Sequence, residues 1–214
     1  MKRSLLLCLF IFNTFSASGQ EILTIDSNGN KLKGYYLSLD VTHKWIKGHH
    51  VNWETGEPDK PDLEKNRKTH CSKFVASGCK KLGIYILRPP EHKASLLANA
   101  QYDWLLSESG AEQGWTKIEN RDAEATWIEA QQKADRGFVV IAVWRNNDPA
   151  KPGHIAFVRP ANLDINQIKV TGPALIQAGN FNSDSTSLSL GFKKHIKSWP
   201  ENSISFFYNK KLVK

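Results

Sequence analysis

The spacing of apolar residues predicts helices in the first two thirds of the chain and strands in the last third. The clearest helix spans residues 70–83, where apolar and small side chains recur at helical intervals. This face carries Cys71, Phe74, Val75, Gly78 and Leu82. Thr69 is the predicted N-cap of the helix, and Gly83 is its predicted C-terminal stop.

Residues 89–135 are predicted to form a helical insertion. Pro89-Pro90 breaks the chain, and a second amphipathic stripe follows on Leu96, Leu97, Ala100, Trp104 and Leu105. Another helix is expected over residues 123–135, with Trp127, Ala130 and Ala134 on its inward face.

After this insertion the apolar runs become short and rich in β-branched residues, which is typical of buried strands. Strands are expected over residues 137–146, 154–160, 173–179, 187–192 and 203–210, with a short helix around 193–198. Helices that precede a run of antiparallel strands indicate the α+β class, in which a helix layer packs on an antiparallel sheet.

The start of the chain has the features of an export signal. A charged start, an apolar run and small residues predict a signal peptide over residues 1–19, cleaved near Gly19 and Gln20. The apolar run is shorter than the roughly 20 residues that a membrane span needs. We therefore expect a secreted or periplasmic protein without a stable membrane anchor, and a single domain over residues 20–214.

Composition is that of one globular domain with a basic surface. Residues 20–68 are polar at first and then rich in aromatic residues, Gly and Pro, so we expect an irregular N-terminal region there. The formal net charge of +8 favours anionic polymers such as cell wall as partners. Nucleic acid is disfavoured because the sequence has no dense Lys/Arg block and no nucleic-acid-binding motif. We expect a monomer.

Two cysteines follow the predicted signal peptide, and they should not pair with each other. Cys71 and Cys79 are eight residues apart on one predicted helix, a rise of about 12 Å. A disulfide needs Cα atoms within about 7 Å. Cys71 stands at the helix start, where free N–H groups and the helix dipole favour a thiolate, so it is a candidate nucleophile. The alternative is a small buried apolar side chain.

A thiol nucleophile needs a base, and His154 is the best candidate. It opens an apolar strand after Gly153, whose small size would give a substrate access to the ring. His195 follows two lysines, which favours a solvated position. Gln177 or Asn180, one strand and turn after His154, could accept the ring N–H and orient it.

The segments THCSKFVASGCKKLGI, GHIAFVRP and LIQAGNFN together resemble the papain-fold peptidoglycan amidases and endopeptidases. The first is similar to the cysteine helix start of NlpC/P60 domains, and the second resembles both NlpC/P60 and CHAP domains. The resemblance implies a papain-like fold in which Cys71 is the nucleophile and His154 the base. It also implies that Gln177 or Asn180 is the third member of the triad and that the substrate is a wall peptide.

The sequence departs from that pattern in several places. Thr69-His70 replaces an acidic residue before the cysteine, Lys73 replaces a glycine, and the insertion over residues 89–135 is long. Aromatic residues before Cys71, among them Trp53 and Tyr36, could line the substrate site together with Gly153.

Other kinds of site are less well supported by the sequence. His43, His49, His50 and His70 have no metal-ligand spacing with Cys71, so no metal or other cofactor is expected. A serine hydrolase would need a G-x-S-x-G elbow, which the sequence lacks. The alternatives are a wall-binding module without catalysis, and a papain-like acyltransferase or lipid amidase.

Overall fold

The computed structural model describes residues 21–60, 69–197, 199–200 and 203–213. The predicted signal peptide over residues 1–19 lies outside them. The elements in chain order are β1 (Ile22–Leu23), α1 (Ser27–Ser38), α2 (Cys71–Lys81), α3 (Leu97–Leu105), α4 (Glu108–Glu112), β2 (Trp115–Ile118), α5 (Ala123–Asp135), β3 (Phe138–Trp144), β4 (His154–Val158), β5 (Leu163–Asp164), α6 (Ile165–Thr171), β6 (Ala174–Gln177), β7 (Ser183–Ser187), α7 (Leu188–Gly191) and β8 (Ile204–Leu212).

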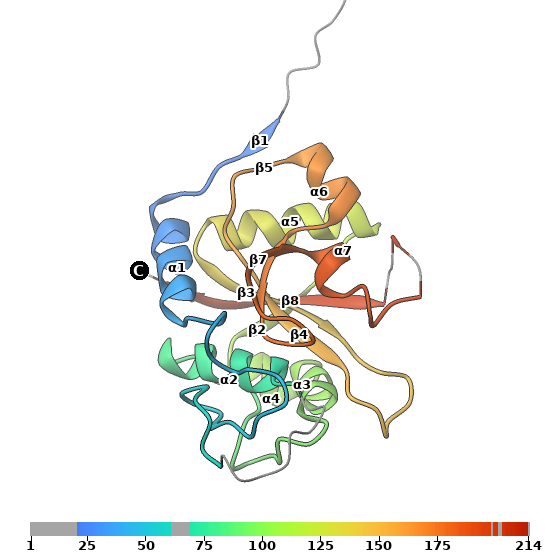
Figure 1. Ribbon diagram of the computed structural model, residues 1–214. Coiled ribbons are helices and arrows are strands. Elements are labelled where there is room, and N and C mark those ends of the chain that lie inside the picture. The colour runs from blue at the N-terminus through green and yellow to red at the C-terminus, as the bar shows by residue number, and fades with distance from the viewer. Residues whose placement is uncertain (1–20, 61–68, 198, 201–202, 214) are drawn as a thin grey trace, which may run out of the picture.

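A six-stranded sheet organises the molecule, with the strand order β2-β8-β3-β4-β6-β7. Every neighbouring pair in it is antiparallel. The two short strands β1 and β5 pair separately at one end of the molecule (Figure 1). The prediction of helices combined with an antiparallel sheet, the α+β class, agrees with this architecture.

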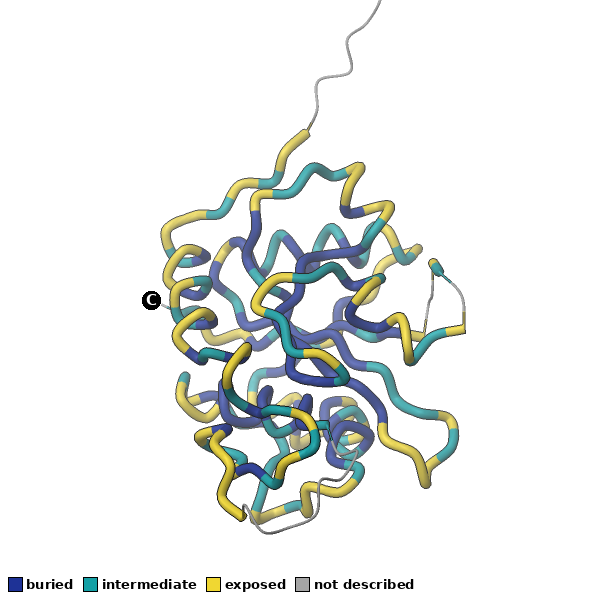
Figure 2. The backbone as a smooth tube through the Cα atoms, in the orientation of Figure 1, coloured by how far each residue is buried: buried dark blue, intermediate teal, exposed yellow. Residues whose placement is uncertain are grey.

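Helices cover both faces of the sheet, whereas the sequence predicted a single helix layer. Figure 1 shows α5 on one side of the strands and α2 and α3 on the other. Successive side chains of β4 enter different cores: Ile155 and Phe157 pack with α2, and Ala156 and Val158 pack with α5. The central strands are therefore apolar without alternation, because both of their faces are buried (Figure 2).

The start and end of α2 follow local chemistry that the sequence only partly predicted. The N-cap is His70 instead of Thr69, and it makes no side-chain capping bond. At the other end Gly83 has φ +64° and its N–H bonds the carbonyl of Lys80. The predicted glycine stop is therefore confirmed, since that backbone region suits a residue without Cβ.

Four regions differ from the prediction. Residues 20–68 are not irregular throughout, because α1 forms after Asp26, whose side chain caps the helix by accepting from the Gly29 N–H. Residues 89–135 are not only a helical insertion, because they contain β2, which pairs with β8 at the sheet edge. The run 187–192 was predicted as a strand, but residues 188–191 are α7, capped by the Ser187 hydroxyl. The described part of the predicted helix over 193–198 forms turns.

Among the described residues, no helix has both the length and the apolar character needed to cross a membrane.

The close contact between α2 and β4 depends on Gly78. A Cβ at this position would lie 2.8 Å from two atoms of the Phe157 ring, which is fully buried. Phe157 is held in turn by Tyr36, whose ring stacks on it at 4.8 Å. Any side chain at residue 78 must therefore push α2 away from the strand.

We predict that Gly78→Ala destabilises the protein by about 1–3 kcal/mol, because it overpacks a rigid aromatic core. Denaturant unfolding followed by circular dichroism measures the change. The matched control is Gly34→Ala in α1, where a Cβ meets nothing within 4 Å and alanine should stabilise the helix by about 0.5–1 kcal/mol. Equal effects of the two substitutions would contradict the packing argument.

Candidate active site

Cys71 is the first residue of α2, and its side chain is 5% exposed. The backbone N–H groups of Cys71 itself, of Ser72 and of Ile155 act on the thiol and favour its ionised form. Ile155 directly follows His154 in β4. Packing α2 across the start of β4 therefore brings the thiol to the residue next to the imidazole.

Burial raises the pKa of the Cys71 thiol, and this effect outweighs the three N–H groups, which lower it. The sequence predicted the opposite shift, a lowered thiol pKa at the helix start. A helix start favours the thiolate only when the sulfur keeps some hydration, and here the apolar core removes it. The thiol is therefore neutral in the free protein.

His154 is the first residue of β4 and is almost completely buried. Its Nε2 lies 3.0 Å from Oε1 of Gln177 in the neighbouring strand β6. The Gln177 amide is itself oriented, because its Nε2 donates to the carbonyl of Phe181 at 3.3 Å. Since an amide oxygen only accepts, His154 carries its proton on Nε2 and leaves Nδ1 free to accept one.

The structure distinguishes between the two candidates for the third residue. Gln177 contacts the ring, whereas Asn180 Oδ1 accepts a hydrogen bond from Nζ of Lys47 at 3.3 Å. Two glycines leave space for the Gln177 and His154 side chains. A Cβ at Gly191 would lie 2.8 Å from Gln177 Oε1, and one at Gly179 would lie 3.1 Å from His154 Cε1. Asn180 therefore does not take the predicted position.

His195 covers the His154 ring instead of facing solvent as the sequence suggested. The two imidazoles stack at 4.5 Å with an interplanar angle of 10°, and Phe192 contacts the His154 ring edge-on at 4.7 Å. Burial, followed by the neighbouring His195, lowers the pKa of His154 to about 3. Burial also lowers the pKa of His195 to about 4. Both rings are therefore neutral near pH 7.

The thiol and the imidazole are not bonded to each other in this structure. Among the described residues, no hydrogen bond joins Cys71 to His154, whose Nε2 is used by Gln177. Ile155 points its side chain into the α2 core, whereas the His154 ring lies against Phe192 beside α7. At rest the thiol therefore belongs to the core on the α2 side of the sheet, and the imidazole contacts the core on the α7 side, although Cys71 and His154 are linked through the backbone of Ile155.

A cleft of about 590 Å³ opens on Cys71 and Gly153. One wall is largely apolar and comes from the segment before and within α3, and the other is polar and comes from the segments preceding α2. The apolar wall includes Ala94, Leu96, Leu97 and Ala98, and the polar wall includes His49, His50, Thr69 and His70.

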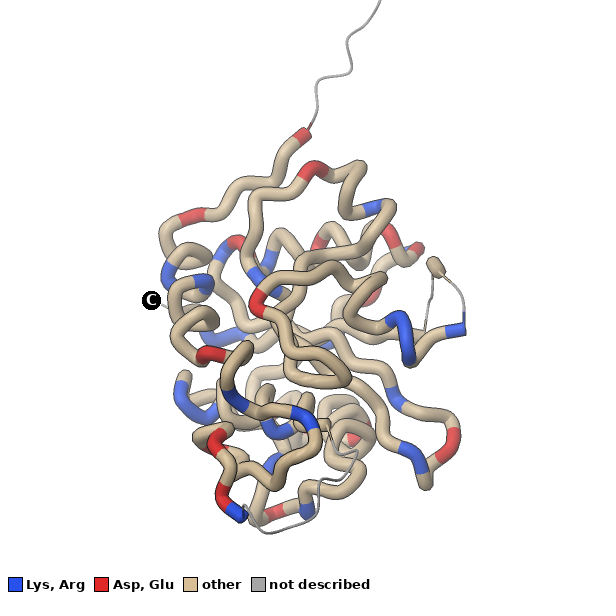
Figure 3. The backbone as a smooth tube through the Cα atoms, in the orientation of Figure 1, with Lys and Arg blue, Asp and Glu red and all other residues tan. Residues whose placement is uncertain are grey.

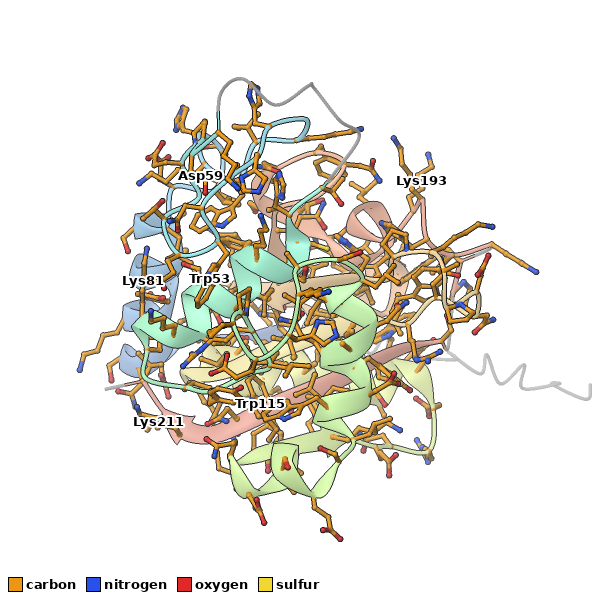
Figure 4. The ribbon with its side chains drawn as sticks, turned by 90° about the horizontal axis from the view of Figure 1, so that it is seen from below. Trp53, Asp59, Lys81, Trp115, Lys193 and Lys211 are labelled. Carbon is orange, nitrogen blue, oxygen red and sulfur yellow. The ribbon has the colours of Figure 1, made fainter. Side chains whose placement is uncertain are left out.

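Two of the three predicted substrate-binding residues lie elsewhere. Tyr36 is fully buried in the core, so it cannot line a substrate site. Trp53 packs under Nζ of Lys80, 5.3 Å from the ring centre, near the far end of α2 from Cys71 (Figure 4). Gly153 does line the cleft, but a Cβ there would lie 2.4 Å from the Trp144 carbonyl oxygen, so packing alone requires glycine.

The polar wall contains residues that sequence reasoning considered only as metal ligands. Nδ1 of His50 is hydrogen-bonded to Oδ1 of Asp59, and Nε2 of His70 lies 2.9 Å from the carbonyl oxygen of His49. Burial lowers the pKa of His70 to about 4. Among the described residues, no three His, Cys, Asp or Glu side chains are grouped to hold a metal ion. Nine residues separate His50 from Asp59, so no short motif indicates the pair.

Comparison with protein-family models and with curated protein sequences gives no match for this chain. The family resemblance of the Cys71 and His154 segments therefore stays a prediction.

We predict that Cys71 reacts slowly with iodoacetamide near neutral pH, because its pKa is raised by burial. The rate should still increase above about pH 9, where an ordinary thiol with a pKa of about 8.5 approaches its plateau. Mass spectrometry of the labelled peptide separates Cys71 from Cys79, which is fully buried. A rate that levels off below about pH 7 would instead indicate a thiolate–imidazolium pair.

Proposed function

We propose that the protein is an exported papain-like cysteine hydrolase that cleaves amide bonds, with wall peptides as its substrates. One observation carries this proposal: a cysteine at a helix start lies against the strand that begins with His154, and His154 is oriented by Gln177. A protein that only binds its ligand needs neither the thiol nor the oriented imidazole.

The arrangement of elements supports a papain-like fold. The cysteine helix α2 packs on an antiparallel sheet, and the Cys–His–amide order along the chain is the order that the resemblance implies. The insertion between α2 and β3 supplies both α3, which borders the cleft, and α5, which covers the opposite face of the sheet.

The geometry suits general-base catalysis instead of a preformed ion pair. Since thiol and ring are both neutral at rest, the proposed mechanism has His154 Nδ1 remove the thiol proton once substrate binding brings the two groups together, as the sulfur attacks the carbonyl carbon. Gln177 holds the ring in the tautomer that makes this possible. The His195 ring excludes water from the His154–Gln177 hydrogen bond.

Backbone donors are present for the charge that develops on the substrate. The N–H groups of Cys71 and Ser72 lie at the start of α2 and favour the ionised form of the thiol. Donors of this kind, fixed before the reaction, are the means by which acyl-transfer enzymes stabilise an oxyanion.

The cleft favours a peptide over a long acyl chain. It has one largely apolar wall and one wall of imidazoles and a hydroxyl, which suits a chain of alternating side chains and backbone amides. The net charge of +8 suits an anionic wall. In the view of Figure 3 basic and acidic positions are interspersed around the outline, which is typical of a soluble surface.

We predict that Cys71→Ala abolishes digestion of purified peptidoglycan, since the acyl-enzyme cannot form without the sulfur. Mass spectrometry of released fragments measures turnover and identifies the bond that is cut. Cys79→Ala is the matched control, because this thiol is buried in the core away from the cleft and should leave turnover within about threefold. Undiminished digestion by Cys71→Ala would exclude the mechanism.

We predict that Gln177→Ala lowers kcat by about 10²-fold, because the imidazole loses the acceptor that fixes its tautomer. Asn180→Ala should change kcat by less than about threefold, since Asn180 bonds Lys47 instead of the ring. Initial rates at saturating substrate measure both variants. A silent Gln177→Ala together with an inactive Asn180→Ala would reverse the assignment.

A further inference from the structure

His50 and Asp59 face each other across a small turn beside the cleft. Val51 and Pro58 form an antiparallel bridge, and the Asp59 N–H donates to the His50 carbonyl at 3.3 Å. The turn closes at Gly56, whose φ of +78° suits glycine. The backbone thus holds the two side chains together, and Nδ1 of His50 bonds Oδ1 of Asp59.

The His50 ring belongs to the same cleft as Cys71. Both residues line the cavity of about 590 Å³. The His50 side chain is 29% exposed and that of Asp59 is 34% exposed. Figure 4 shows Asp59 on the loop beside α2. An imidazole in this position has both a partner that fixes its orientation and contact with the space that a substrate would fill.

The two imidazoles near Cys71 have opposite electrostatic surroundings. The partners of His154 are the neutral Gln177 amide and the His195 ring, and no carboxylate within 4 Å offsets an imidazolium there among the described residues. His50 has the carboxylate of Asp59, and the hydrogen bond from His50 holds the pKa of Asp59 below its ordinary value. Among the described residues, His50 therefore has a carboxylate partner and His154 has none.

Other titratable groups also act around this dyad. His49 and His70 belong to the same wall, and the charges of His50, His49 and Lys73 all disfavour protonation of His70. Asp59 is the acidic group that directly contacts His50.

We propose that His50, held by Asp59, is a second acid–base residue of the Cys71 site, serving the leaving amine and the hydrolytic water. This inference rests on the proposed function. His154 would then need only to take the proton of the Cys71 thiol, and the exposed dyad would serve the groups that enter and leave through the cleft.

The proton transfers balance over one turnover. In acylation the S–C bond forms and the thiol proton moves to His154 Nδ1. As the C–N bond breaks, this proton passes by way of His50 to the departing nitrogen, so both rings are neutral in the acyl-enzyme. In deacylation a water oxygen bonds to the carbonyl carbon and its proton moves to His50. The C–S bond breaks and the sulfur takes this proton from His50. The sum is amide and water giving acid and amine.

The chain contains a matched control pair. Nδ1 of His43 lies 2.6 Å from Oδ1 of Asp40, but the His43 side chain is 79% exposed and does not line the cleft. The variants His50→Gln and His43→Gln therefore remove chemically similar imidazoles from the same N-terminal region.

The test uses 4-nitrophenyl acetate, whose leaving group departs without a proton. The initial burst of nitrophenolate reports acylation of Cys71, and the steady state reports deacylation by water. We expect His50→Gln to keep the burst rate within about threefold and to slow the steady state by about 10²-fold, because only the second step needs its base. His43→Gln should change neither rate.

Other outcomes separate this inference from the proposed function. Equal slowing of burst and steady state, or no slowing of either, would overturn the role of His50. Absence of a burst in the unaltered protein would overturn both proposals, because Cys71 would not be a nucleophile. A normal burst without digestion of peptidoglycan would overturn only the wall substrate.

Asp59→Asn should reproduce the slow steady state of His50→Gln, and a wild-type steady state in Asp59→Asn would overturn the dyad.

Discussion

The contact of α2 with β4 is the interaction on which the rest of the site depends. Gly78 allows the helix to approach the Phe157 ring, and the ring is stacked on Tyr36 from α1. Because this contact lies two turns from the helix start, it fixes the position of Cys71 along β4. The thiol consequently reaches the N–H of Ile155, one residue after the imidazole. A packing constraint in the core thus determines the geometry of a chemical site.

The same burial that positions the site removes its charge. Desolvation raises the thiol pKa and lowers the pKa of His154 to about 3, so the proposed mechanism requires proton transfer to accompany attack by the sulfur. A carboxylate partner would raise the pKa of His154, but Gln177 is neutral. The pair therefore avoids leaving an unpaired ion in the core, which would cost several kcal/mol.

Local signals predicted the parts of the fold in which one face is buried or a turn residue is required. Residues 71–81 and 123–135 form helices as their spacing predicted, and 154–158 form a strand. The helix over 27–38 was missed because its sequence has little amphipathic pattern; its start depends on the capping side chain of Asp26. The choice between Gln177 and Asn180 needed the register of β4 and β6, which no local pattern contains.

The site was harder to predict because its properties come from residues distant in the chain. Cys71 and His154 could be selected from their positions at a helix start and a strand start. The direction of the thiol pKa shift could not be predicted, because it depends on how completely the sheet and α2 exclude water. His195 reaches His154 only through the turn after α7, and the fold brings His50 to the cleft from before α2. His154 and Gln177 form a buried pair with no carboxylate beside the ring among the described residues, whereas His50 is paired with Asp59 on the exposed wall of the cleft. If the proposed mechanism holds, the separation of these two imidazoles divides the proton transfers, because the buried ring serves the thiol and the exposed ring serves the groups that enter and leave through the cleft.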